Sequence, residues 1–327
     1  MNRLPFEQEK REILVKREAK TDPRFGCVPE LRPVEHIINY GIVNINKPKG
    51  PTSHEVSEYV KRILGISKAG HSGTLDPAVT GVLPIALGSA TKVTSTLLKA
   101  GKEYVALAHF HKEMPQSELR RAFESFVGKI KQIPPVRAAI KRVERQRMVY
   151  YLDILEIEGK DVLFRIGCEA GTYIRKLIHD IGQSLGVGAH MTQLIRTRVG
   201  PFTDSTMITL QDLEDALWYW KHEKNEKFIR YCIRPVEEAV VHLPKIWLVD
   251  SAIDSVCRGA LLNVPGVSML ESGIAIGDIV ALQSLKGELV AIAKATMFSQ
   301  QIMTAVKGTV AKTERVFMPP GTYPKSQ

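Results

Sequence analysis

One carboxylate in a glycine-rich string has the setting best suited to chemistry. Asp76 lies in KAGHSGTLDPAVTGVLP, residues 68–84, whose glycines at positions 70, 73 and 81 permit tight turns and close backbone approach. An apolar run follows directly, at residues 82–87. This order of residues presents an acid at the edge of an apolar site, where its reactivity can be tuned. The dipeptide Asp76-Pro77 by itself would more often be a simple turn, so the full string carries the prediction.

Other reactive side chains do not combine into a site. His109 and His111 share one face of a predicted strand, but two histidines without further ligands do not make a metal site. The sequence has no C-x-x-C pair, no phosphate-binding loop and no complete dinucleotide fingerprint. We therefore expect no metal and no nucleotide cofactor. The four cysteines are far apart and predict free thiols in a reducing compartment: Cys27, Cys168, Cys232 and Cys257.

The elements around Asp76 can be predicted from local patterns. GIVNINKP, residues 41–48, predicts a strand that Pro48 stops, and Thr52 with Glu55 forms the capping box of a helix that ends at Gly65. Further strands are expected at 103–110 and on both sides of a turn near Gly159. Further helices are expected at 117–127, 173–185 and 209–223, the last capped by Thr209. Hairpins mixed with helices predict an α+β fold.

The length of 327 residues fits two domains. Residues 1–40 form a charged extension, which is either disordered or tied down on another domain. A compact domain is expected over 41–243, a small β-rich domain over 244–320, and a tail over 321–327. The charged N-terminus lacks a signal-peptide core, and the chain lacks an apolar run of membrane-spanning length. We expect an intracellular protein that is not bound to membranes.

The charge balance favours a polyanionic partner. Lys and Arg number 45 against 35 Asp and Glu, giving a net charge of +10. Part of this excess lies in the run PPVRAAIKRVERQR, residues 134–147, between a predicted helix and a predicted strand. The run is either a solvated loop or, as we prefer, a flexible loop that grips a nucleic acid. Its candidate contacts are Arg137, Lys141, Arg142, Arg145 and Arg147.

Several motifs occur in the order found in one enzyme family. GHSGTLDPAVTGVLP is similar to the catalytic motif of the TruB/dyskerin family of RNA pseudouridine synthases. INKPKGPTSHEV, KEY, GTYIRKLIHDIG and HMTQLIRTRVGPF resemble other segments of that family, and residues 245–320 resemble a PUA domain. The resemblance implies a pseudouridine synthase fold, with a mixed, mainly antiparallel central sheet, flanking helices and a small C-terminal β-barrel PUA domain. The N-terminal extension would pack on the PUA domain.

The resemblance also implies roles for single residues. Asp76 would be the catalytic aspartate, paired with Arg175, and Tyr104 would stack on a base flipped out of the RNA. The remaining residues with implied roles are Tyr173, Leu194 and Arg196 around the pocket, His71 in the space left by the extruded base, and Lys47 and Pro48 under the catalytic loop. The family often has two arginines after this leucine, whereas the string here is Leu194-Ile195-Arg196.

From the residues alone these positions also have structural interpretations. Arg175 lies one residue off the apolar stripe of its helix, so it points either into a cleft or into solvent. Tyr104 suits cross-strand packing as well as base stacking. Tyr173 and Leu194 also suit a core position, and His71 suits a hydrogen-bonded loop.

The motifs are most similar to the archaeal, guide-dependent branch of the family. In that branch the enzyme acts on ribosomal RNA, with transfer RNA as a further substrate, inside a cytoplasmic box H/ACA ribonucleoprotein. The implied partners are the guide RNA, the substrate RNA and small accessory proteins of zinc-ribbon, small β-barrel and kink-turn-binding ribosomal types. The implied isomerisation is redox-neutral and requires no cofactor. Two alternatives are a stand-alone transfer-RNA pseudouridine synthase and a non-catalytic RNA-binding scaffold.

Overall fold

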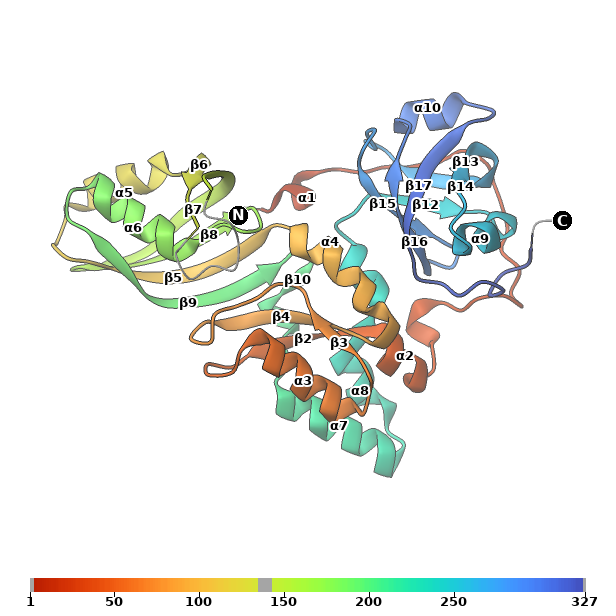
Figure 1. The fold of residues 1–327 in the computed structure, drawn as a ribbon, viewed down its shortest axis with the longest axis horizontal. Coiled ribbons are helices and arrows are strands. Elements are labelled where there is room, and N and C mark those ends of the chain that lie inside the picture. The colour runs from red at the N-terminus through yellow and green to blue at the C-terminus, as the bar shows by residue number, and fades with distance from the viewer. Residues whose placement is uncertain (1–2, 135–142, 326–327) are drawn as a thin grey trace.

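The computed structural model describes residues 3–134 and 143–325. In this part of the chain the strands form two sheets, one of ten strands and one of seven (Figure 1). We call the part built on the ten-stranded sheet the large domain and the part built on the seven-stranded sheet the small domain. Both contain helices beside mixed, mainly antiparallel sheets, as the sequence predicts.

The large sheet has the order β11-β2-β4-β9-β5-β8-β7-β6, with β3 paired to β4 and β10 paired to β9. Its parallel pair joins β4 to β9, which brings the end of the Asp76 string beside residues 195–196. Its strands are β2 (Gly41–Lys47), β3 (Ala69–His71), β4 (Thr80–Leu87), β5 (Lys102–Phe110), β6 (Gly128–Gln132), β7 (Arg145–Glu158), β8 (Asp161–Cys168), β9 (Ala189–Val199), β10 (Phe202–Thr203) and β11 (Ile233–Pro235).

Helices cover the two halves of this sheet. One group packs its apolar residues against β2 and β4, and another packs against β5 and β8, so the sheet has two separate cores (Figure 1). The first group is α2 (Val34–Tyr40), α3 (Ser53–Leu64), α7 (Leu210–Glu223) and α8 (Glu226–Cys232); the second is α5 (Gln116–Ser125) and α6 (Ile174–Ser184). Between the halves lies the short helix α4 (Thr94–Lys99).

Local signals in the sequence explain where two of these helices begin. Thr52 accepts a hydrogen bond from the Glu55 amide, and the Glu55 carboxylate accepts from the Thr52 amide, which completes the predicted capping box of α3. Gly65 ends α3 in the left-handed region, at φ 66°. Thr209 and Asp212 form the same box at α7. These helices are therefore fixed by contacts within one turn of chain.

The small domain is a curled seven-stranded sheet with the order β1-β14-β12-β15-β16-β17-β13. Apolar residues of its strands form one core with helix α9. Its elements are β12 (Lys245–Leu248), α9 (Asp250–Cys257), β13 (Leu262–Asn263), β14 (Val267–Glu271), β15 (Ile279–Gln283), β16 (Leu289–Ala295), α10 (Ser299–Thr304) and β17 (Thr309–Val316). Its edge strand β1 (Ile13–Val15) comes from the N-terminal segment.

The N-terminal segment connects the two domains. Its first helix, α1 (Pro5–Gln8), lies at the large domain, where Leu4 is fully buried and Glu7 pairs with Arg198 at 2.6 Å. The chain then crosses to the small domain, where β1 pairs with β14 (Figure 1). Sequence patterns leave open whether this segment is disordered or tied down, because its charged residues show little periodicity.

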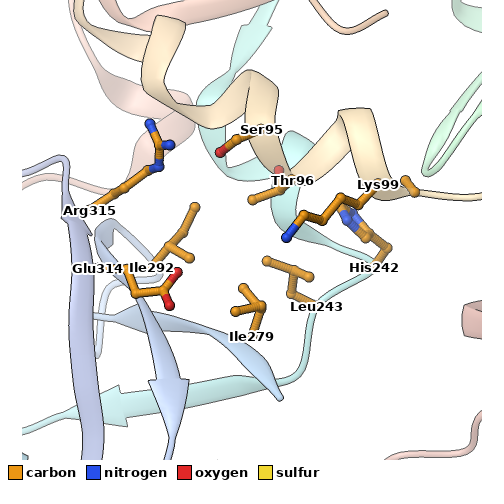
Figure 2. A pocket seen from close by; sticks show the side chains of 10 residues that line it. Ser95, Thr96, Lys99, His242, Leu243, Ile279, Ile292, Glu314 and Arg315 are labelled. Atoms are coloured by element: carbon orange, nitrogen blue, oxygen red, sulfur yellow. The ribbon is translucent and has the colours of Figure 1, made fainter. Parts of the chain in front are cut away.

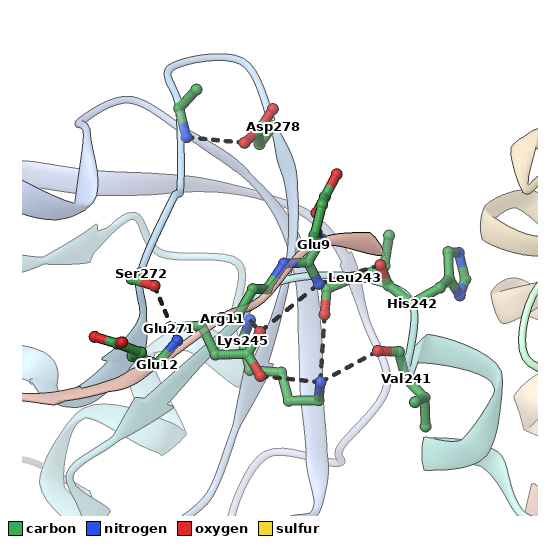
Figure 3. Close-up of polar contacts among 11 residues, drawn as sticks. Glu9, Arg11, Glu12, Val241, His242, Leu243, Lys245, Glu271, Ser272 and Asp278 are labelled. Atoms are coloured by element: carbon green, nitrogen blue, oxygen red, sulfur yellow. Dashed lines mark hydrogen bonds and ion pairs between the residues drawn. The ribbon is translucent and has the colours of Figure 1, made fainter. Parts of the chain in front are cut away.

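Polar contacts and a shared core hold the domains together. Arg11 of the N-terminal segment donates to the carbonyl of His242, in the linker between the domains, at 3.3 Å (Figure 3). Glu237, which forms a two-pronged ion pair with Arg32 at 2.8 Å, also accepts a hydrogen bond from the Leu289 amide of the small domain at 2.8 Å. Apolar residues of both domains also belong to one buried cluster. The two domains are therefore packed as one unit.

The region around the basic run differs from the prediction. The sequence predicts a continuous loop over residues 134–147, but Arg145 and Arg147 lie at the start of strand β7, which pairs with the unpredicted strand β6. The β6 residues GKIKQ show no strong apolar alternation, so pairing with β7 stabilises a strand that local pattern does not indicate. Arg137, Lys141 and Arg142 lie outside the described residues.

Candidate active site

The loop that carries Asp76 joins β3 to β4 and is held from beneath by a buried lysine. The ammonium group of Lys47 donates to the carbonyls of Pro48, Pro77 and Val79, at 2.9, 3.2 and 3.0 Å. The Lys47 side chain is fully buried, and burial lowers its pKa, although the nearby Asp76 carboxylate acts in the opposite direction. Three carbonyl oxygens around one cation fix the backbone that follows Asp76 to the end of β2.

A serine and an arginine hold the earlier part of the same loop. The Leu75 amide donates to the hydroxyl of Ser53, at the start of α3, at 2.8 Å. Arg196 of β9 donates to the carbonyl of Gly73 at 3.2 Å and to that of Val82 at 2.8 Å. Residues on both sides of Asp76 are therefore attached to the two halves of the sheet.

Gly81 allows β4 and β9 to come close enough for the Arg196 contacts. It has φ +104°, and a Cβ atom there would lie 2.2 Å from the carbonyl oxygen of Arg196. No side chain fits such a distance, and positive φ also disfavours other residues. A steric requirement thus explains why the sequence motif has glycine at position 81.

Asp76 itself points to a cavity and meets Arg175. The distance between Asp76 Oδ2 and Arg175 Nη2 is 2.5 Å, and the two side chains are 56% and 59% exposed. Arg175 lies in the first turn of α6, off its buried face. The expected pairing of these residues is therefore present in the geometry, and the carboxylate stays accessible to a ligand.

The cavity beside Asp76 has a volume of about 680 Å³, within the range of ligand sites. It lies where the β3–β4 loop, α4, β5, β9 and the start of α6 converge. Six of the residues singled out in the sequence line it: Asp76, Tyr104, Tyr173, Arg175, Leu194 and Arg196. The wall thus combines one carboxylate and two guanidinium groups with aromatic and aliphatic side chains.

Buried cations lie around this cavity. Lys102 of β5 donates to the carbonyls of Leu97, Leu98 and Ala100 at 2.9–3.2 Å, and burial lowers its pKa to about 8. Arg196 is 1% exposed, and burial lowers its pKa as well. Backbone carbonyls satisfy the hydrogen bonds of both groups but carry no net charge, so the site has a positive interior that favours an anionic ligand.

The aromatic residues of the cavity are held in place by neighbouring strands. Tyr104 belongs to the core of β5, β8 and α6, and burial raises the pKa of its hydroxyl. The backbone of Tyr173 exchanges two hydrogen bonds with the Gln132 side chain, at 3.0 and 3.1 Å, so β6 fixes the start of α6. The Tyr104 ring thus has a structural role in addition to lining the cavity, and the backbone of Tyr173 is fixed by β6.

Other predicted residues lie outside the cavity wall. His71 of β3 accepts a hydrogen bond from the Gly73 amide at 3.3 Å and stabilises the base of the loop. Pro48 is exposed and contributes its carbonyl to Lys47. Arg147 packs against Gly171 and lies 3.7 Å from Glu169, while Arg145 lies opposite Gln132 in the sheet.

Sequence reasoning did not single out several residues of the site. Leu98, Lys102 and Met191 line the cavity, Ser53 anchors the loop, and Gln132 orients Tyr173. Lys102 belongs to the motif KEY, but a lysine at the start of a strand gives no sign of burial. The others carry no local signal, since their contacts join segments distant in sequence.

Within the described ranges, no group of three or more His, Cys, Asp or Glu side chains could hold a metal ion. The same ranges contain no helix with the length and apolar character needed to cross a membrane.

Four family models match consecutive parts of the chain. The model of the TruB family pseudouridylate synthase N-terminal domain matches residues 61–174, and that of the tRNA pseudouridylate synthase B C-terminal domain matches residues 175–241. The DKCLD (NUC011) domain matches residues 1–57, and the PUA domain matches residues 244–317. The first two meet within the candidate site, between Ile174 and Arg175.

Relatives and solved structures match nearly the whole chain. A probable tRNA pseudouridine synthase B of Methanopyrus kandleri is 54% identical over 99% of this chain and 96% of its own. That of Pyrococcus furiosus is 55% identical over 97% of this chain and 94% of its own. A chain in a Cbf5-Nop10-Gar1 complex is 54% identical with TM-score 0.95, and both chains are covered to 99%.

A chain in an H/ACA RNP bound to a substrate RNA containing 2'-deoxyuridine is 52% identical, with TM-score 0.93 and coverage of 99% and 100%. These matches confirm the fold and the family that the motifs predicted. The chain therefore belongs to the TruB family of pseudouridylate synthases, in a form that joins the synthase domain to DKCLD and PUA domains.

Proposed function

We propose that this protein isomerises uridine to pseudouridine in RNA, with Asp76 as the catalytic residue. The observation that carries the proposal is the accessible Asp76 carboxylate, paired with Arg175 at 2.5 Å, at the wall of a cavity that Tyr104 also lines. The reaction breaks the bond between C1′ and N1 of uridine, turns the base and rejoins it through C5, after which C5 loses its proton and N1 gains one. The target base must leave its stack to reach the carboxylate.

The cavity suits a uridine that is flipped out of RNA. The Tyr104 ring supplies an aromatic surface for the base, and Leu194 adds apolar contact. Arg175 holds the Asp76 carboxylate toward the sugar. Two routes are then open to Asp76, namely attack on C1′ as a nucleophile or removal of a sugar proton. The positive interior formed by Lys47, Lys102 and Arg196 favours entry of the phosphate backbone.

The protein acts, in this proposal, as the catalytic subunit of a box H/ACA guide ribonucleoprotein. Solved relatives above 50% identity were crystallised as an archaeal box H/ACA sRNP Nop10-Cbf5 complex, as a Cbf5-Nop10-Gar1 complex and as an H/ACA RNP with substrate RNA. The corresponding partners here are a guide RNA, a substrate RNA and such small accessory proteins. Arg145 and Arg147, with the basic residues beyond the described part, would hold the substrate. Free thiols at all four cysteines fit a reducing, cytoplasmic location.

Reconstitution with a matched guide RNA and a labelled target tests the proposal. The wild-type protein should form pseudouridine at the paired uridine, whereas Asp76→Asn should form none while binding RNA normally. Asp215→Asn, an exposed aspartate of α7, is the matched control and should retain full activity. Undiminished activity of Asp76→Asn would show that this carboxylate is not catalytic. Absence of product from the wild type with its partners would favour a non-catalytic RNA-binding scaffold.

A second candidate function is guide-free modification of transfer RNA. The observation that favours it is the name of the curated relatives, which is probable tRNA pseudouridine synthase B. Incubation of the protein with a transfer-RNA transcript and no guide separates the two. Product at a single uridine under these conditions would establish the guide-free activity.

A further inference from the structure

A second cavity lies between the two domains. Its volume is about 310 Å³, at the lower end of the range for ligand sites. Helix α4 of the large domain forms one side, strands β15, β16 and β17 of the small domain form the other, and the linker at His242 and Leu243 closes the base (Figure 2). None of the roles described above uses this space.

Three charged side chains around this cavity have no protein partner. Lys99, Glu314 and Arg315 are exposed to solvent and make no side-chain hydrogen bond or ion pair with another described residue. The Lys99 ammonium and the Glu314 carboxylate both point into the space (Figure 2). Two cations and one carboxylate around a single cavity suit a ligand that carries both a negative charge and hydrogen-bond donors.

The wall facing these charges is apolar. Ile279 and Ile292 of the small domain and Leu243 of the linker form it, and Ile292 is 2% exposed within the core that both domains share. A flat ring system can lie on such a surface while its edge meets Glu314. An apolar floor with a carboxylate and two cations matches a nucleotide: the base on the floor, its amino or imino group on Glu314, and the phosphate at Lys99 and Arg315.

Helix α4 connects this cavity to the candidate active site. Leu98 lines the cavity beside Asp76, whereas Ser95, Thr96 and Lys99 line the cavity between the domains. One short helix thus forms a wall of both. The shared core fixes the domains together with two hydrogen bonds, from the Leu289 amide to Glu237 at 2.8 Å and from Lys92 to the Val316 carbonyl at 3.1 Å, so the second cavity is preformed rather than made on binding.

We propose that the cavity between the domains binds one unpaired nucleotide of the RNA on which the protein acts. The nucleotide would leave the RNA stack beside the catalytic cleft and fix the position of the RNA across α4. This inference deepens the proposed function and depends on RNA being the substrate. The residues that would contact the nucleotide are Lys99, Glu314 and Arg315 around the floor of Ile279, Ile292 and Leu243.

One variant fills the cavity without changing its charge, and a second removes a charge without filling it. Ser95→Phe places a ring in the space from the side of α4, and Arg315→Ala removes one cation. Lys312→Ala is the matched control, because it removes the same charge from an exposed position of the same strand, outside the cavity. The measurements are the Kd for substrate RNA and for a transfer-RNA transcript, at one fixed salt concentration, with the full-length protein.

We expect Ser95→Phe and Arg315→Ala to raise the Kd at least about fivefold and Lys312→Ala to change it less than about twofold. Product formation at saturating RNA should stay at the wild-type level in all three variants. Wild-type affinity of a folded Ser95→Phe protein would overturn the inference, whatever Arg315→Ala does. If Ser95→Phe does not fold, ultraviolet cross-linking of the wild-type protein to RNA tests the inference instead. We expect the cross-linked peptides to include residues 95–99 or 314–315, and the absence of these peptides would overturn the inference.

Two further measurements complete the test. The first asks whether the ligand of this cavity is RNA or a free nucleotide, and the second separates the role of this cavity from that of the catalytic site. Adenosine 5′-monophosphate tests a free nucleotide as the ligand: binding that Ser95→Phe abolishes, together with unchanged RNA affinity, would overturn RNA as the source. Asp76→Asn tests the proposed function separately, since it should lose product formation and keep the wild-type Kd. A protein whose wild type makes pseudouridine but whose Ser95→Phe variant binds RNA normally refutes only the second cavity.

Discussion

Gly81→Ala tests whether the close approach of β4 and β9 builds the candidate active site. The added Cβ would lie 2.2 Å from the carbonyl oxygen of Arg196 and 3.0 Å from both its carbonyl carbon and its amide nitrogen. These are backbone atoms that cannot rotate away, so the two strands must separate. Arg196 would then move from the carbonyl of Gly73 that it holds beneath the catalytic loop.

The magnitude can be worked out against a glycine with the same backbone angle. Gly81 has φ +104° and Gly128 has φ +103°, but no atom lies within 4 Å of a Cβ built at Gly128. Positive φ costs both alanine variants about 1–3 kcal/mol. Overpacking adds about 1–3 kcal/mol at Gly81 alone. We therefore expect a loss in unfolding free energy of about 2–6 kcal/mol for Gly81→Ala and about 1–3 kcal/mol for Gly128→Ala.

Urea denaturation of both variants measures this difference, and a pseudouridine assay under folding conditions measures its effect on the site. Gly81→Ala should lose most product formation because Arg196 and the loop shift together, whereas Gly128→Ala should keep it. Equal destabilisation of the two variants would refute the steric argument. Full activity of Gly81→Ala would refute the link between the strand contact and the site.

Three other variants test single contacts in and near the site. Arg175→Ala should lower the unfolding free energy by less than about 1 kcal/mol, because its ion pair is more than half exposed. The same variant should reduce product formation at least about tenfold. Unchanged product formation would contradict the proposed role of Arg175. Lys47→Met leaves the carbonyls of Pro48, Pro77 and Val79 without their donor and should lower the unfolding free energy by about 2 kcal/mol or more. Lys49→Met, at the exposed position nearby, should change the unfolding free energy little when both are measured by urea denaturation. Burial lowers the pKa of His242 from 6.5 to about 4. Between these pH values the unfolded chain binds more protons than the folded protein, so the unfolding free energy should fall as the pH drops from about 6.5 to 4. His242→Gln should make the unfolding free energy less dependent on pH in this range, and an unchanged pH dependence would show that His242 is not its cause.

The parts of the fold that sequence predicts are those fixed by nearby residues. The capping boxes of α3 and α7 and the apolar stripe of α6 each depend on contacts within a few positions, so their helices can be placed to within about two residues. Strand β6 and the N-terminal β1 could not be predicted, because each gains its stability from a partner distant in sequence. The same reason applies to Gln132, whose side chain orients Tyr173 across 41 positions.

The sequence motif identified the residues around Asp76, but it did not predict the contacts that fix these residues in place. Lys47 is expected under the loop only by resemblance, and its three carbonyl contacts require the folded positions of Pro48, Pro77 and Val79. Burial of Arg196 and Lys102 without a carboxylate partner runs against their usual exposure, so composition and periodicity argue for the opposite environment. Charged residues in a buried site are where sequence patterns inform least.

The pairing of β1 with β14 also bears on how the protein is made. Residues 13–15 leave the ribosome early, whereas their partners at 269–271 emerge only after most of the chain has been synthesised. Until β14 has been synthesised, β1 has no strand to pair with. Afterwards β14 is an unpaired edge of the sheet until β1 binds to it. Loss of the first fifteen residues would therefore leave a sheet edge exposed to pairing with other chains, and aggregation of the small domain would be the first visible defect.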